Sequence, residues 1–341
     1  MKILEVKNLK TSFFTHMGEV QAVRGISFDL EKGEILGIVG ESGSGKSVTS
    51  LSIMGLIDEP GKIKEGQILF QGKDLSKLTH HELEDIRGND ISMIFQDPMT
   101  SLNPVFRIGN QIKEIILEHT DLSKEEAHEK AVKLLKLVNI PEPETRINQY
   151  PHQFSGGMRQ RALIAMALSC DPKLLIADEP TTALDVTIQA QILELLRELK
   201  DKVDLSIILI THDLGVIAEI CSDVIIMYGG LVMEKGSVFD IFENPQHPYT
   251  KGLHQSMPKN VRGSKERLIP IKGTPPDLLE PPTGCPFSPR CPHAMEICMK
   301  KAAPLFKIEK GHTAACWLHH EDAPKVENYI KVKGDAFDEI V

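Results

Sequence analysis

The sequence predicts an α/β fold with a largely parallel sheet covered on both faces by helices. Short apolar runs at 35–39, 174–177 and 206–210 are typical of buried strands, and helical segments separate them. A glycine-rich loop at 40–47 directly follows the first run, and 48–56 has the character of a helix leaving that loop. Strands that alternate with helices in this way form parallel sheets.

The composition narrows the class of protein. The chain of 341 residues suggests about two domains. Its 48 acidic residues against 39 basic ones give a net charge of -9. The sequence has no dense Lys/Arg cluster of the kind that indicates a nucleic-acid-binding surface. We see no signal peptide and no run approaching the ~18 apolar residues of a membrane span. We therefore expect a cytosolic protein whose six cysteines are reduced thiols or metal ligands.

The loop at 40–47 fits the pattern G-x-x-x-x-G-K-[ST]. Glycines allow successive backbone N–H groups to surround a phosphate, and the following helix adds its positive N-terminus. Lys46 can reach the β- and γ-phosphates, and the Ser47 hydroxyl can bind Mg²⁺. The pattern predicts binding of a nucleoside triphosphate, with contacts from Ser42, Gly43, Ser44, Gly45, Lys46, Ser47 and Val48.

The first 35 residues alternate apolar and polar side chains, which predicts antiparallel strands joined by a turn near Gly18. Phe13 is the aromatic that we expect to stack on adenine, and Phe14 is the alternative. A helical block between about 105 and 160 interrupts the α/β pattern. Within it, Ser123 and Glu126 form a capping box.

Two adjacent carboxylates, Asp178 and Glu179, follow the buried strand at 174–177. Ligands of open α/β sheets bind at the carboxyl ends of the strands. Asp178 can hold Mg²⁺, and Glu179 can polarise an attacking water. Together with Lys46, this pair predicts nucleotide hydrolysis.

The segment FSGGMRQR at 154–161 begins with Ser155, which can cap a helix whose first turn is opened by Gly156 and Gly157. The segment resembles the LSGGQ signature of ATP-binding-cassette (ABC) ATPases. Phe154 and Met158 depart from the commonest spelling and match that of the peptide-transporter branch. The resemblance implies that Ser155, Gly156 and Gly157 contact the ATP of an opposite subunit.

Other residues match the same family in its order along the chain. Gln96 resembles the Q-loop glutamine that touches Mg²⁺ and water, and 182–185 resembles the D-loop, whose Asp185 faces the opposite subunit. His212 resembles the switch histidine at the γ-phosphate. The resemblance implies a P-loop NTPase core of the ABC-ATPase type, with an antiparallel β-subdomain and a helical subdomain.

The chain beyond about residue 240 resembles the C-terminal region of oligopeptide and dipeptide importer ATPases, on the segments NPQHPYT at 244–250 and GCPFSPRCP at 284–292. We therefore expect an ABC ATPase domain at 1–240 and a small irregular C-terminal domain at 241–341. Since periodicity fades there and prolines multiply, we expect a separate appendage.

Four of the six cysteines, Cys285, Cys291, Cys298 and Cys316, lie in this C-terminal region. A structural zinc site usually has close C-x₂₋₄-C pairs, which are absent. The wider spacing favours a [4Fe–4S] cluster, with Zn²⁺ or plain thiols as the alternatives. Because this region is far in sequence from Lys46 and Glu179, we expect a structural or assembly role. Cys170 and Cys221 lie in apolar helical surroundings and are expected to be buried structural thiols.

The resemblance implies an ATP-hydrolysing subunit, peripheral at the cytoplasmic face of the membrane, that powers peptide import. Its partners would be two transmembrane permease subunits, a second ATP-binding subunit and, indirectly, an extracytoplasmic solute-binding protein, with no nucleic acid. Nickel import by the same motor is an alternative. A soluble ABC ATPase acting on nucleic acid or ribosomes is less favoured, since such proteins carry a long coiled-coil insertion or two cassettes.

Overall fold

The computed structural model describes residues 1–97, 101–182, 184–257, 270–332 and 337–338, with the last two residues described in their backbone alone. The chain divides into two compact units. Unit 1 comprises Met1–Ile3, Leu30–Ile35 and Lys77–Ile210, and unit 2 comprises Leu4–Asp29, Leu36–Ser76 and Thr211–Val341. Each unit is described by itself.

Unit 1 contains three parallel strands in the order β8-β7-β6. These strands are β6 (Ile91–Ile94), β7 (Leu174–Asp178) and β8 (Ser206–Thr211). Leu174 of β7 lies between Ile91 and Ser206 in the ladder. Every residue of β7 and β8 is buried, which is why both strands are continuous apolar runs in the sequence. The predicted parallel strands are confirmed.

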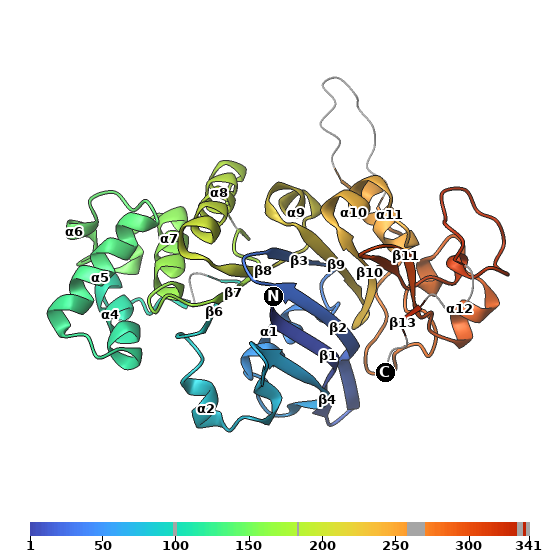
Figure 1. The fold of residues 1–341 in the computed structure, drawn as a ribbon, viewed down its shortest axis with the longest axis horizontal. Helices are drawn as coiled ribbons and strands as arrows, with labels where there is room; N and C mark the ends of the chain where they lie inside the picture. Colours follow the sequence, from blue (N-terminus) through green and yellow to red (C-terminus); the bar gives the residue numbers. More distant parts are fainter. Residues whose placement is uncertain (98–100, 183, 258–269, 333–336, 339–341) are drawn as a thin grey trace, which may run out of the picture. The chain divides into compact units, whose positions relative to one another are not determined.

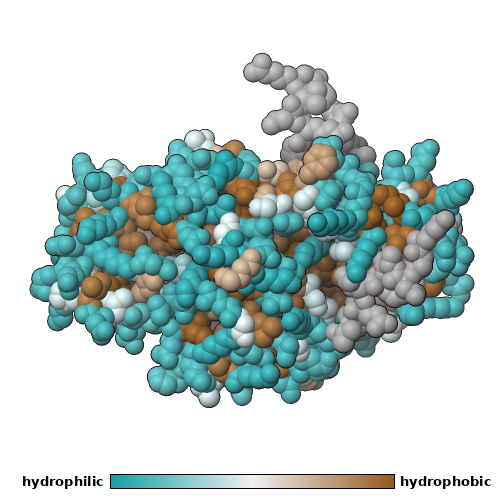
Figure 2. Space-filling view, viewed as in Figure 1, coloured by the Kyte–Doolittle hydropathy of each residue, from teal (hydrophilic) through white to brown (hydrophobic). Residues whose placement is uncertain are grey.

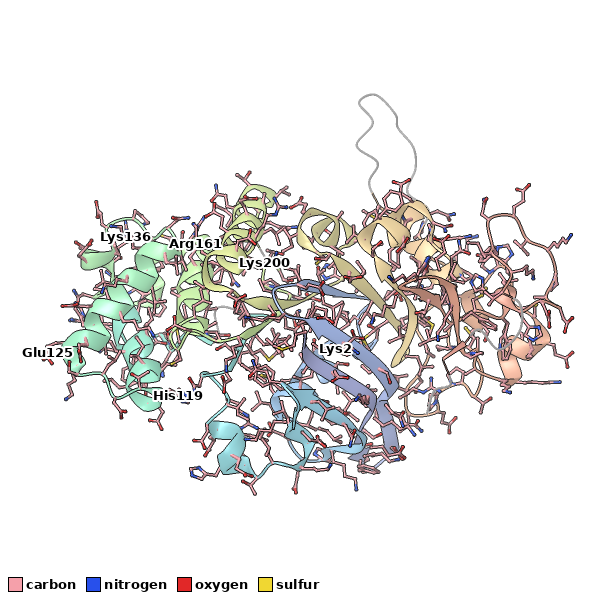
Figure 3. The ribbon with its side chains drawn as sticks, viewed as in Figure 1. Lys2, His119, Glu125, Lys136, Arg161 and Lys200 are labelled. Atoms are coloured by element: carbon pink, nitrogen blue, oxygen red, sulfur yellow. The ribbon has the colours of Figure 1, made fainter. Side chains whose placement is uncertain are left out.

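Most of the rest of unit 1 is helical. The group consists of α4 (Ile108–His119), α5 (Lys124–Leu137), α6 (Pro143–Arg146) and α7 (Gly156–Ala167), which gather at one end of the unit in Figure 1, and α8 (Val186–Val203) follows β7 in sequence. The predicted capping box forms at the start of α5, where Ser123 accepts the N–H of Glu126 and Glu126 accepts the N–H of Ser123. Arg161 of α7, labelled in Figure 3, donates to the carbonyl oxygen of Val138 at 2.9 Å and so joins α7 to the end of α5.

Unit 2 contains an antiparallel sheet in the order β2-β1-β4-β5. Its strands are β1 (Lys2–Thr15), β2 (Gly18–Glu31), β4 (Gly61–Phe70) and β5 (Lys73–Asp74). Alternate residues of β1 such as Leu4 and Val6 are buried, as the alternation in the sequence predicts. The strands and the turn near Gly18 are confirmed.

Unit 2 also contains a run of sheet strands that begins with β3 (Ile35–Val39) and β9 (Asp223–Tyr228), which pair in parallel. Helix α1 (Lys46–Met54) follows β3, and α9 (Leu214–Ile220) packs so closely on β3 that a Cβ at Gly37 would lie 2.5 Å from Ile217. Gly229 and Gly230, with φ of 56° and 78°, turn the chain from β9 into the antiparallel β10 (Leu231–Ser237).

The C-terminal segment continues this sheet in the order β10-β12-β11-β13, and this differs from the expected irregular appendage. The strands are β11 (Leu305–Glu309), β12 (His312–Ala314) and β13 (Phe337–Asp338), and the helices of the region are α10 (Val238–Glu243), α11 (Pro248–Gln255) and α12 (Glu296–Lys300). Phe306 and Ile308 alternate into a small core with Ala303 and Ala314. Strands this short leave too few repeats for the sequence pattern to predict them.

A buried carboxylate joins β10 to the C-terminal segment. Glu234 accepts from His312 Nε2 at 2.8 Å, and also from the N–H groups of Gln246 and His247 at 2.6 and 2.8 Å. A buried charge is tolerated only where hydrogen bonds satisfy it, so these contacts fix the segment on the sheet.

On the face drawn in Figure 2, hydrophilic side chains cover most of the surface and apolar ones are scattered among them. No helix among the described residues combines the length and the apolar character that crossing a membrane requires.

Candidate nucleotide site

The loop at 40–47 connects β3 to α1 in unit 2, as the sequence predicts. Gly43 and Gly45 have φ of 77° and 99°, a left-handed conformation that other residues rarely adopt. A Cβ at Gly40 would lie 2.2 Å from the carbonyl oxygen of Met227, and one at Gly45 would lie 2.5 Å from that of Ala22. The glycines are therefore required by backbone conformation and by close packing.

Two buried polar side chains lie in this loop. The ammonium of Lys46 donates to the carbonyl oxygens of Gly40 and Glu41 at 2.7 and 3.0 Å. The hydroxyl of Ser44 is 3% exposed and has no hydrogen-bond partner among the described residues. Buried polar groups in proteins are nearly always satisfied, so an unpaired hydroxyl here indicates a place for a ligand. A cradle of backbone N–H groups with a lysine and a free hydroxyl fits a phosphate.

The carboxylates of unit 1 lie where β7 ends. Asp178 is the last residue of β7 and is buried. Glu179 follows with a φ of 46°, so its backbone leaves the strand in the left-handed region. Its Oε2 accepts from Gln96 Nε2 at 3.1 Å and from the Thr182 hydroxyl at 2.8 Å. Gln96 and Glu179 are thus brought together, while the contact with Thr182 was not predicted.

The segment at 154–161 begins α7 in unit 1. Ser155 caps the helix by accepting the N–H of Met158 at 3.3 Å, as predicted. The preceding residue, Phe154, is buried. Ser155 and Gly156 are exposed. A Cβ at Gly156 would meet only Leu184, at 3.6 Å, whereas one at Gly157 would lie 2.7 Å from Ile188. The exposed helix start is open to a ligand or another molecule.

Asp185, His212 and the two candidate aromatic residues complete the predicted set. Asp185 is exposed and caps α8 by accepting the N–H of Ile188 at 3.0 Å. His212 directly follows β8 and is exposed. Phe14 is 40% exposed with the Lys62 ammonium 4.7 Å from its ring centre, and Phe13 is half-buried. Ala183, within the segment that resembles the D-loop, lies outside the described residues.

The two units hold different parts of the predicted set. Unit 1 contains Gln96, Ser155, Gly156, Gly157, Asp178, Glu179 and Asp185. Unit 2 contains Phe13, the loop at 40–47, Val48, His212 and the four C-terminal cysteines. Within each unit these residues lie at strand ends and helix starts, which is where parallel α/β folds bind ligands.

The four C-terminal cysteines line one cavity in unit 2 together with His247, Phe287 and His293. Burial raises the pKa of Cys285 to about 12 and that of Cys291 to about 11. Across the described residues, no group of three or more His, Cys, Asp or Glu side chains is arranged to hold a metal ion. The metal predicted at these cysteines, whether [4Fe–4S] or Zn²⁺, is therefore not confirmed. Cys170 and Cys221 are partly buried, and burial raises the pKa of both thiols.

Comparisons with known proteins give consistent results. A family model described as ABC transporter matches residues 23–182, and one described as oligopeptide/dipeptide transporter, C-terminal region, matches 233–298. The oligopeptide transport ATP-binding protein OppD of Bacillus subtilis (strain 168) is 58% identical over 97% of this chain and 93% of its own length. The dipeptide transport ATP-binding protein DppD of the same organism is 55% identical over 99% of both chains.

A solved structure extends this likeness to the fold. The ATP-binding cassette MJ0796, in a dimeric post-hydrolysis state bound to ADP and Pi, superposes with a TM-score of 0.62 and is 28% identical. The match covers 69% of this chain and 98% of that chain.

Fold and relatives together define the class: this chain is an ATP-binding cassette ATPase, an enzyme that hydrolyses ATP to drive transport. Within that class it belongs to the family of oligopeptide and dipeptide transport ATP-binding proteins. The resemblance seen in the sequence is confirmed.

Proposed function

We propose that this chain powers the import of di- and oligopeptides through permease subunits, from the cytoplasmic face of the membrane. The observation that carries the proposal is likeness over nearly the whole chain to ATP-binding proteins of oligopeptide and dipeptide transport. It includes the C-terminal region beyond the cassette, which has its own family model. The domain boundary near residue 240 is part of this proposal.

The loop at 40–47 and Val48 bind the phosphates of ATP. The unpaired Ser44 hydroxyl and the Lys46 ammonium supply a donor and a positive charge, and the N-terminus of α1 adds its dipole. Phe13 stacks on the adenine, with Phe14 as the alternative. Mg²⁺, held by Ser47, Asp178 and Gln96, would neutralise the phosphate charge.

Glu179 orients or deprotonates the attacking water, and His212 contacts the γ-phosphate. Two donors, Gln96 and Thr182, converge on the same Glu179 oxygen. They hold this oxygen in one place, and positioning of this kind supplies much of the rate in phosphoryl transfer.

A second ATP-binding subunit completes each site. Ser155, Gly156 and Gly157 begin α7 on an exposed surface, where bare N–H groups suit the phosphates of an ATP carried by the opposite subunit. Asp185 is exposed at the start of α8 and faces that subunit. ATP then favours the closed pair through its higher affinity for it, and hydrolysis resets the pair.

The permeases dock on a surface of unit 1 beside α4 where apolar and charged side chains are mixed. Val105, Phe106 and Leu117 are 71%, 52% and 38% exposed. A cavity there is lined by Phe106 and Leu117 together with polar and charged residues, namely Asn110, Lys113, Glu114, Glu118 and Lys124. Exposed apolar patches mark protein contacts, and an ABC transporter ATPase needs a membrane partner to act on. An extracytoplasmic solute-binding protein acts only indirectly, through the permeases.

The C-terminal cysteines hold a [4Fe–4S] cluster. Four thiols around one cavity supply the donor set that such a cluster takes. Cys285, Cys291, Cys298 and Cys316 would be its ligands, and Zn²⁺ bound to the same thiols is the alternative.

Co-purification from membranes tests the partners. The tagged chain should recover multispan permeases and a second ATP-binding subunit, and this recovery should fail in Phe106→Asp. Recovery of nucleic acid or ribosomes in their place would overturn the proposal. A nickel transport system among the partners would leave the motor intact and change the solute.

A further inference from the structure

The phosphate loop carries a charged residue that the proposed chemistry does not use. Glu41 follows Gly40, and its carboxylate lies 2.7 Å from Nη1 of Arg290, which directly precedes Cys291. The Arg290 side chain is 5% exposed and that of Glu41 is 25% exposed. A charge pair this sheltered is only weakly screened by salt, in contrast to the surface ion pairs of this chain.

Arg290 is held in place from several sides. Its guanidinium donates to the Tyr228 hydroxyl at 2.9 Å and to the carbonyl oxygens of Ile271 and Lys272 at 3.1 and 3.0 Å. The guanidinium also lies over the rings of Tyr228 and Phe287. Because these contacts orient the planar guanidinium of Arg290, its Nη1 is positioned to donate to Glu41 before a nucleotide binds.

The backbone of Glu41 also forms a hydrogen bond with the C-terminal region of unit 2. Its N–H donates to the hydroxyl of Tyr249 at 2.9 Å, and Tyr249 is fully buried in α11. Its carbonyl oxygen accepts from Lys46 at 3.0 Å. One residue of the phosphate loop is therefore tied to the C-terminal region through both its side chain and its main chain.

A carboxylate beside a triphosphate site works against binding. Glu41 carries a negative charge within the loop that must accept several more, and like charges at such range repel strongly when water is partly excluded. Arg290 cancels this charge and also limits the orientations of the loop. Neither role is visible in the sequence pattern, because x in G-x-x-x-x-G-K-[ST] stands for any residue.

We propose that Arg290 is a positioning residue for ATP binding, which neutralises Glu41 and thereby makes the cysteine-bearing segment a determinant of nucleotide affinity. This inference rests on the proposed role of the loop at 40–47 as the ATP site. It also replaces the expectation that distance in sequence separates the cysteine region from the nucleotide: the segment Cys285–Cys291 reaches the loop through Arg290.

The test measures the Kd of Mg·ATP by calorimetry on the full chain, with the melting temperature recorded alongside. Arg290→Met should raise the Kd about tenfold, the effect of losing one charge-assisted contact beside the phosphates. Glu41→Gln combined with Arg290→Met should return the Kd to within about threefold of wild type, because the double variant no longer has a Glu41 carboxylate that needs to be neutralised. Rescue of this kind is not expected if Arg290 only stabilises the fold.

Lys331→Met is the matched control. The Lys331 ammonium also ties backbone carbonyls of the C-terminal region, those of Leu318 and Ala323, at 2.9 and 2.7 Å, but contacts no residue of the loop in the described hydrogen bonds. It should lower the melting temperature and leave the Kd of ATP unchanged. An unchanged Kd in Arg290→Met, or a double variant as weak as the single one, would overturn the inference. Lys46→Ala distinguishes failure of the inference about Arg290 from failure of the proposed ATP site. If this variant binds ATP normally, the assignment of the loop at 40–47 as the ATP site is wrong.

Discussion

Gln96 donates its side-chain amide to the same Glu179 oxygen that accepts the Thr182 hydroxyl, at 3.1 and 2.8 Å. The contact joins residues 83 positions apart in sequence, one just beyond β6 and one just beyond β7. Both donors hold that oxygen at the end of β7.

Glu179→Gln should retain ATP binding and lose about 10²–10⁴ in turnover, the usual contribution of a positioned base. The amide keeps the size of the side chain and removes the charge that activates water. Phosphate release under saturating ATP measures the turnover, and trapping of an ATP-bound dimer on size exclusion gives a second readout. Hydrolysis at the wild-type rate would remove Glu179 from the mechanism.

Gly156→Asp should abolish dimer closure and hydrolysis while the isolated monomer still binds ATP. The new side chain has room, since the nearest atom to its Cβ is 3.6 Å away on Leu184, so the fold should survive. Its carboxylate would oppose the phosphates of the partner's ATP. Gly156→Ala is the control, because it adds a side chain at this position without adding a negative charge. If the monomer itself loses ATP, the signature does not serve the opposite subunit.

Phe106→Asp should release the chain from membranes that contain the permeases. The ring is 52% exposed, so a charge there costs the folded chain little but disrupts an apolar interface. ATP binding by the variant shows that the fold is intact. The comparison variant is Phe239→Asp, at an exposed phenylalanine of unit 2 that is 72% exposed. Equal retention of both variants on membranes would contradict the docking surface.

Anaerobically purified protein should be brown, absorb near 400 nm and contain about four irons per chain. Serine in place of any one of Cys285, Cys291, Cys298 or Cys316 should bleach the protein, because each of these thiolates would be a ligand of the proposed cluster. Cys170→Ser and Cys221→Ser are the controls and should keep the colour. Colourless protein with one zinc would establish the zinc alternative, and colourless protein without metal would leave free thiols.

The parallel strands could be predicted because each is a continuous apolar run, and the caps at Ser123 and Ser155 because each is a local signal. Long-range pairings could not. Arg290 and Glu41 are 249 positions apart, and Glu234 and His312 are 78 apart, so no pattern in the chain brings them together.

Within the site, the sequence motifs identified the loop glycines and the two carboxylates. They did not reveal that Thr182 contacts Glu179, since a hydroxyl three positions away has many other possible partners. The strands β11 and β12 were also missed, because β11 mixes polar and apolar residues over only five positions and β12 has only three, whereas the five residues of β7 are all buried and apolar up to the last one.

Peptide uptake by the reconstituted transporter is the most direct test of the proposed function. Vesicles containing the permeases, both ATP-binding subunits and the solute-binding protein should accumulate a labelled dipeptide or oligopeptide when supplied with Mg·ATP. Glu179→Gln in this chain should reduce that uptake strongly. ATP hydrolysis without peptide accumulation, or accumulation of Ni²⁺ in place of peptide, would contradict the account.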